Sequence, residues 1–257
     1  GGTKGGMKIG DPIHFLPTCT STNDVVKDMA AHGAPEGTVV IAEEQTSGKG
    51  RYQRHWFSSC GKGLYISVLL RPPQPEISLL TLSAGLAVAE ALWNVFGVKV
   101  CLKWPNDLLW EGKKLGGILS ESSFIGNHLN HVVVGIGLNI NHNKKDFPEG
   151  IRETSISLKQ IKHKDVDKDL FLQNLWKVLE IWYDFYVQKK TDLIIASFME
   201  SSCYSPGQKL IALTDKGAVL GTFKRVDQRG GVVLETRDGV NTYFAVDIKS
   251  LQEAKEN

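Results

Sequence analysis

A glycine-rich segment carries three cations within six residues, at Lys49, Arg51 and Arg54 in the run 45–56. Glycine lets backbone N–H groups approach an anion closely, and an arginine fork binds phosphate oxygens in pairs. Trp56, at the end of the run, can stack on a base. The alternative is a solvated surface loop, but loops of this length are commonly functional. We therefore interpret the run as an anion-binding loop.

A second stretch with chemical potential is Lys103-Trp104-Pro105-Asn106-Asp107. Trp-Pro-Asn-Asp is a good type I turn by itself, and a turn explains the proline. A turn does not explain a lysine directly before a tryptophan at the end of an apolar strand. We therefore expect this stretch to border a ligand site.

Two predicted strands, in residues 113–119 and 135–141, carry glycines in their interior. Alternation along the second strand puts Gly135, Gly137 and Asn139 on one side of the sheet. A strand with interior glycines either bulges or lets a ligand lie against its backbone. Together the two strands would form the floor under a flat ligand with an apolar body and a phosphate. The side chains that we expect around this floor are Lys103, Asp107 and Lys114.

The histidines do not predict a metal site. His128 and His131 have HxxH spacing and His142 follows, but no cysteine or acid stands at a spacing that would complete a zinc site. We interpret all three as surface residues and expect no metal fixed by the protein alone. No GxSxG-type nucleophile elbow surrounds any serine or cysteine.

The composition excludes several classes of protein. With 42% hydrophobic and 23% charged residues among 257, the chain is an ordinary globular one rather than disordered, collagen-like or coiled-coil. A net charge of +2 is too small for binding a polyanion by bulk charge. No apolar run approaches the roughly 18 to 20 residues of a membrane span. The four cysteines form no CxxC pair, and we expect them to be reduced thiols in a cytoplasmic protein.

The hydrophobic pattern predicts a mixed α/β domain followed by a small all-β unit. Ser21 is expected to cap a helix of about three turns that ends before Gly33. Further helices are predicted at 78–96 and 167–188, and strands at 38–42, 63–70, 98–103, 115–120 and 131–140. Beyond a boundary near 203–206, strands at 209–213, 219–226 and 232–236 alternate with glycine turns, which is typical of a small antiparallel barrel.

Taken in order, these motifs resemble those of the biotin protein ligases, also called biotin–[acetyl-CoA-carboxylase] ligases. The resemblance runs from about Phe15 to the last barrel strand, and the cationic loop and the Lys-Trp-Pro-Asn-Asp block are specific in combination. The stretches that carry it are Ser21-Thr22-Asn23, Gly48-Lys49-Gly50-Arg51 with Arg54 and Trp56, Lys103 to Asp107, Lys114 to Leu119, and Gly135 to Asn139.

The resemblance implies an α+β fold. Residues 7–203 would form a class II synthetase-like catalytic domain, with a mixed sheet flanked by helices, and residues 204–257 an SH3-like β-barrel behind a leader at 1–6. The implied ligase activates biotin with ATP to biotinyl-5′-AMP and then transfers biotin to a lysine of a biotin carboxyl carrier protein or domain. The implied ligands are ATP, Mg²⁺ that enters with it, and biotin.

The resemblance also implies residue roles. Lys114 would reach the biotin carboxylate and the α-phosphate, and we hypothesise that Asp107 orients or deprotonates the acceptor lysine. The implied catalytic residues are Lys114, Arg51 and Asp107. The implied biotin-binding residues are Ser21, Thr22, Asn23, Gln45, Gly48, Lys49, Gly50, Arg51, Lys114, Gly117, Leu119, Gly135 and Gly137. The implied ATP- or adenylate-binding residues are Arg51, Arg54, Trp56, Lys103, Asn106, Asp107, Lys114 and Asn139.

The chain departs from the common loop pattern at Lys49, which replaces an arginine and loses its planar fork, and at Gln53, which replaces a glycine and reduces backbone freedom. Some relatives carry an N-terminal DNA-binding helix-turn-helix. Only about ten residues precede the catalytic domain here and the net charge is near zero, so we expect no DNA partner. Because no membrane span is predicted, we also expect no membrane partner, and a homodimer stays open. We expect the barrel to serve ATP binding or the transfer step through Lys224 and Arg225, rather than biotin recognition.

Two alternatives to biotin ligation remain. A lipoate or octanoate ligase shares the fold, but those relatives lack the Lys-Trp-Pro-Asn-Asp block. A non-catalytic biotin-binding module is the other alternative, and the joint presence of Arg51, Lys114 and Asp107 argues against it.

Overall fold

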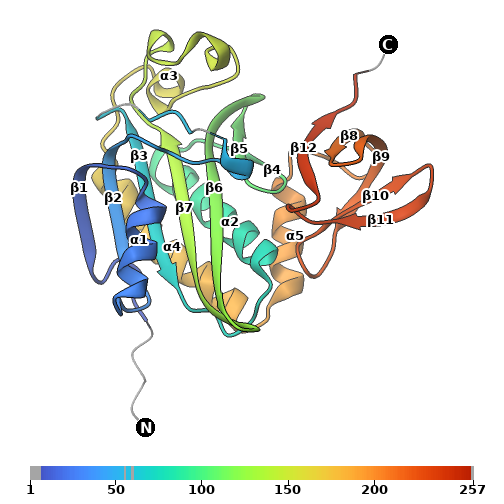
Figure 1. The fold of residues 1–257 in the computed structure, drawn as a ribbon. Coiled ribbons are helices and arrows are strands. Elements are labelled where there is room, and N and C mark those ends of the chain that lie inside the picture. The colour runs from blue at the N-terminus through green and yellow to red at the C-terminus, as the bar shows by residue number, and fades with distance from the viewer. Residues whose placement is uncertain (1–6, 55, 59–60, 256–257) are drawn as a thin grey trace.

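The computed structural model describes residues 7–54, 56–58 and 61–255, which form two sheets with helices packed around the larger one (Figure 1). The larger sheet has the order β1-β2-β3-β7-β6-β5-β4, with β1 parallel to β2 and the other neighbours antiparallel. Its strands are β1 (Ile13–Cys19), β2 (Val39–Gln45), β3 (Gly63–Leu70), β4 (Cys101–Lys103), β5 (Asp107–Trp110), β6 (Lys113–Ile125) and β7 (His128–Asn139). This mixed sheet confirms the predicted α+β class.

Helices cover both faces of the larger sheet because its central strands are apolar on both sides. On one face Val133 of β7 packs with Val26 of α1, whereas its neighbour Val132 belongs to the large core under α2 and α4. Gly97 ends α2 in the left-handed conformation (φ 64°), as its position after the apolar run predicted. The helices are α1 (Thr22–Ala31), α2 (Ile77–Phe96), α3 (Leu158–Lys162), α4 (Lys168–Val187) and α5 (Thr191–Ser201), with 3₁₀ turns at Arg51–Gln53, Lys144–Asp146 and Glu149–Ile151.

The smaller sheet is antiparallel, with the order β11-β10-β9-β8-β12. Gly217 and Gly239 adopt positive φ at its hairpins, as the turn chemistry predicted. Along the described chain no pairing between β11 and β12 closes this sheet into a barrel. Its buried side chains continue the large core, so the two sheets share one apolar interior. Its strands are β8 (Lys209–Thr214), β9 (Gly217–Val226), β10 (Val232–Thr236), β11 (Gly239–Tyr243) and β12 (Ile248–Glu253).

The predicted elements are present, but several others were missed. The edge strand β1 leaves Phe15 69% exposed and lacks a clean alternation, so its sequence gave no strand signal. Ser21 does occupy the N-cap of α1, yet its side chain makes no capping hydrogen bond. The turn after β4 is closed by the Asn106 N–H donating to the Lys103 carbonyl (3.1 Å) around a cis Trp104–Pro105 bond. It is therefore a type VI turn over residues 103–106, in place of the type I turn expected over residues 104–107.

The expectation that no apolar run approaches the length of a membrane span was wrong. Among the residues that the structure describes, α2 is long and apolar enough to cross a membrane by length and composition. Most of its apolar window is buried, however, between the sheet and α4. A largely buried core helix of a soluble protein passes the same test.

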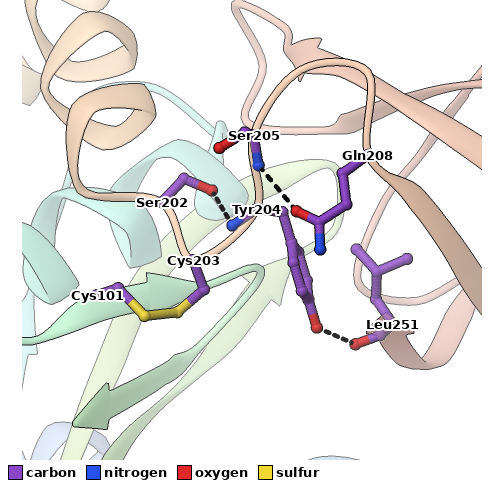
Figure 2. Close-up of a disulfide and its surroundings, with 7 residues drawn as sticks. All are labelled: Cys101, Ser202, Cys203, Tyr204, Ser205, Gln208 and Leu251. Carbon is purple, nitrogen blue, oxygen red and sulfur yellow. Dashed lines mark hydrogen bonds between the residues drawn. A yellow bond between two sulfur atoms is a disulfide. The ribbon is translucent and has the colours of Figure 1, made fainter. Parts of the chain in front are cut away.

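The expectation of four reduced thiols was also wrong. Cys101, at the start of β4, and Cys203, just after α5, form a disulfide (Figure 2). They lie 102 positions apart in the chain, and only the packing of α5 against β4 brings them together. Cys19 is a free cysteine, and Cys60 lies outside the described residues.

Of His128, His131 and His142, the last two are buried rather than on the surface. His142 is fully buried, and its ring stacks on Phe147 at a centroid distance of 4.8 Å. Burial lowers the pKa of His142 to about 4 and also lowers the pKa of His131, so both side chains are neutral near pH 7. His128 is exposed, as expected. No group of three metal-ligating side chains occurs among residues 7–54, 56–58 and 61–255.

Candidate active site

A cavity of about 250 Å³ lies on the α1 face of the larger sheet, where that sheet meets β12. Every predicted site residue except Gly48 and Asn139 lines it. Asn139 is buried, and its amide donates to the carbonyls of Lys114 (3.2 Å) and Ile156 (3.1 Å), so it fixes the Lys114 backbone instead. The lining residues that sequence reasoning left out of the site are Tyr65, Trp104, Pro105, Ile118, Ile136, Lys249, Ser250, Leu251 and Gln252.

One end of the cavity is built from buried polar side chains at the start of α1. The Thr22 backbone N–H donates to Gln45 Oε1 (2.8 Å), and Gln45 Nε2 donates to Ser58 (3.2 Å). The hydroxyl of Ser67, buried on β3, lies 2.7 Å from the Thr22 hydroxyl and also within hydrogen-bond distance of Asn23. This network holds donors and acceptors in fixed directions, which suits a compact polar group on a ligand.

The floor of the cavity consists of the glycines of β6 and β7, as strand alternation predicted. In this structure the Trp56 ring lies directly on it. A Cβ on Gly137 would stand 2.9 Å from the Trp56 ring, and one on Gly117 would stand 3.3 Å from it. Only glycine therefore allows a flat ring to approach these strands so closely.

Cations gather at the other end of the cavity, around Asp107. Lys114 Nζ lies 3.1 Å from Asp107 Oδ1 and 4.6 Å from the centroid of the Trp56 ring. Burial lowers the pKa of Lys103 and that of Arg51. Asp107 lies close enough to both that its negative charge raises their pKa values and so opposes the effect of burial. Three cations around one carboxylate leave an excess of positive charge, which suits a phosphate.

The glycine-rich loop is docked on the smaller sheet. Arg51 donates to the carbonyls of Ala245 (3.2 Å) and Ile248, and Arg54 donates to that of Lys249 (3.3 Å). Tyr52 donates its hydroxyl proton to the Ala245 carbonyl (2.7 Å). The carbonyls of residues 245–249 thus anchor the loop, and residues 249–252 form a wall of the cavity.

This wall shows which part of the smaller sheet reaches the cavity, whereas a contact of Lys224 or Arg225 with a carrier protein stays a prediction. Neither Lys224 nor Arg225 lines the cavity, and Lys224 pairs with Glu235 (2.8 Å) on the surface instead. The segment that does line it follows the last hairpin and carries no glycine pattern or cation cluster. No sequence signal marked it, because its role depends on how the two sheets pack.

Lys49, one of the two departures in the loop, is tied to α1. Its ammonium group lies 2.7 Å from Asp24 Oδ1, and the hydrogen bond to Asp24 raises the pKa of Lys49. The pair is partly solvent-exposed, so it contributes little stability but fixes where this part of the loop lies. The Gln53 side chain and His55 lie outside the described residues.

Comparisons with known proteins identify the family to which this chain is similar. The profile of the Biotin/lipoate A/B protein ligase family matches residues 15–139. The bifunctional ligase/repressor BirA of Bacillus spizizenii is 32% identical over 244 residues, which cover 94% of this chain and 74% of that protein. The biotin–[acetyl-CoA-carboxylase] ligase of Mycobacterium tuberculosis is 30% identical over 243 residues, covering 90% and 86%. The structure of the Aquifex aeolicus biotin protein ligase with biotin and ATP is similar at a TM-score of 0.82 and 29% identity, covering 94% of this chain and 99% of that one.

The fold and the site together define a protein of the biotin/lipoate ligase class. Within that class, the chain belongs to the biotin protein ligase family, because the similarity extends over both sheets and over most of the length of the relatives.

Proposed function

We propose that this chain joins biotin to ATP, forming biotinyl-5′-AMP and pyrophosphate, and then transfers the biotinyl group to one lysine of a biotin carboxyl carrier protein. The observation that carries the proposal is the division of a single cavity. One part is a glycine floor bordered by buried hydroxyl and amide groups, and the other holds Lys114, Lys103 and Arg51. Biotin has a fused polar ring, an apolar chain and a carboxylate, in that order. The ring and chain therefore suit the first part of the cavity, and the carboxylate suits the cationic part.

In the first step a carboxylate oxygen of biotin attacks the α-phosphorus of ATP, and the bond to pyrophosphate breaks. Two anions must approach each other, so cations have to be in place before charge develops. Lys114 and Arg51 lie on the cavity wall and supply this charge. We propose that Mg²⁺ enters with the ATP phosphates, since no cluster of three metal-ligating side chains occurs in the described part of the chain.

In the second step a lysine amine of the carrier attacks the acyl carbon, and AMP leaves. The attacking amine must be neutral, and Asp107 is the carboxylate of the cavity that can orient the amine or accept its proton. The loop 48–56 would keep water from the acyl phosphate. Because the Trp56 ring lies on the floor here, it must move before a biotin ring can lie there.

Mass spectrometry tests the proposal. The protein is incubated with ATP, with either biotin or lipoate, and with a biotin carboxyl carrier domain. The expected result is a mass increase of one biotinyl group that depends on ATP, with no lipoyl product. A lipoyl product alone would show that the activity is lipoate ligation. No product with either acid would indicate a non-catalytic module. The cytoplasm, where ATP and carboxylases occur, is the location we propose.

A further inference from the structure

The disulfide Cys101–Cys203 lies between two walls of the cavity. Cys101 stands two residues before Lys103, which begins the cavity-lining turn 103–107. On the other side, Cys203 is followed directly by Tyr204, whose hydroxyl donates to the Leu251 carbonyl (3.0 Å) in the wall 249–252 (Figure 2). A short path of covalent bonds and one hydrogen bond therefore joins the turn to the wall formed by the smaller sheet.

Other contacts hold the same junction, so the disulfide does not act alone. The Cys203 N–H donates to the Leu102 carbonyl (2.9 Å), and the Trp104 indole N–H donates to the Gly230 carbonyl (2.9 Å). The buried side chains of both sheets also form one core. However, β4 has only three residues and is the last strand of its sheet. We therefore expect loss of the disulfide to loosen the smaller sheet without releasing it.

Both cysteines are partly exposed, so a thiol reductant can reach the bond. Reduction by a dithiol breaks the S–S bond with two electrons and two protons, leaves two thiols, and converts the dithiol to its own disulfide. In a reducing compartment the thiol form is favoured, and in an oxidising one the disulfide.

We propose that Cys101–Cys203 is a redox-modifiable site that sets how tightly the smaller sheet closes the cavity. Reduction lets the segment 245–252 move away from the turn 103–107. The same segment accepts the hydrogen bonds of Arg51 and Arg54, so the glycine-rich loop loses part of its docking surface. The expected effect of reduction on retention of biotinyl-AMP rests on the proposed function. The expected loosening between the segment 245–252 and the turn 103–107 does not.

The first test compares oxidised wild-type protein, protein reduced with dithiothreitol, and the variant Cys101→Ser/Cys203→Ser. Reduction is expected to lower Tm by roughly 10 °C, because the bond closes a loop of about a hundred residues. Hydrogen exchange of residues 245–252 should become faster in both the reduced protein and the variant. Cys19→Ser is the matched control, and it should respond to dithiothreitol as the wild type does.

The second test measures release of preformed biotinyl-AMP by rapid filtration. We expect reduction to speed release roughly fivefold, the effect of losing about one ordinary hydrogen bond, and dithiothreitol to have no effect on the double variant. The proposal is overturned if a thiol assay of the oxidised protein finds all four cysteines free. It is also overturned if hydrogen exchange at 245–252 and the rate of adenylate release are the same in both redox states. If no adenylate forms in either state, the proposed function fails, and Tm and hydrogen exchange still decide whether the disulfide controls the junction. If the double variant does not fold, the reduced wild type provides the comparison.

Discussion

Gly137→Ala should weaken biotin binding while leaving the fold intact. The added Cβ would stand 2.9 Å from the Trp56 ring, whereas ordinary van der Waals contacts begin near 3.4 Å, so the ring must move by about half an ångström. Trp56 belongs to a loop and can shift, but a ligand held between the polar end and the cations cannot. Overpacking of this kind typically costs about 1–3 kcal/mol. Biotin should therefore bind roughly tenfold to a hundredfold more weakly.

Isothermal titration calorimetry with biotin measures this loss, and thermal unfolding checks the fold. Gly150→Ala is the matched control, since a Cβ there would meet nothing within 4 Å. Repeating the change in a Trp56→Ala background separates the two causes. If the loss of biotin affinity persists in the Trp56→Ala background, it arises from contact of the new methyl group with biotin. If it disappears there, it arises from displacement of Trp56. Wild-type biotin affinity in Gly137→Ala would refute the assignment of the β6–β7 glycines as the seat of biotin.

Three further predictions concern charge. Lys114→Ala should abolish pyrophosphate release from biotin and ATP with little change in Tm, because its partly exposed pair with Asp107 adds little stability; pyrophosphate release at the wild-type rate would contradict its role. Arg51→Gly should release biotinyl-AMP and so label lysines of bystander proteins, which a streptavidin blot detects; bystander labelling at background with normal carrier labelling would exclude Arg51 from adenylate retention. His142 has a folded-state pKa of about 4, below its ordinary value of about 6.5, so its contribution to stability is complete above pH 6.5 and is lost as the pH falls toward 4. Urea unfolding should show that the free energy of unfolding falls by about 3 kcal/mol across that pH range in the wild type and not in His142→Phe. An equal pH dependence of the two proteins would show that His142 does not cause this loss.

The sequence by itself determined the floor and the chemistry of the cavity. Two-residue alternation fixed that Gly135 and Gly137 share a face, and the structure places both on the α1 side of the sheet. The cationic loop and the turn 103–107 were recognisable because glycine, proline and arginine have local conformational or charge properties that do not depend on distant residues. The long helices α2 and α4 were predicted for the same reason, since a helical repeat is local.

Only the tertiary structure decided what depends on contacts between distant segments. Cys101 and Cys203 pair across 102 positions because α5 packs against β4, and no spacing rule shows this. The wall 249–252 lines the cavity only because the two sheets share a core. His142 looked like a surface residue because a polar side chain gives no sign of burial until the aromatic residues that cover it are in place. Local patterns thus determined the elements and their faces, whereas side-chain environments and cross-links arose from packing.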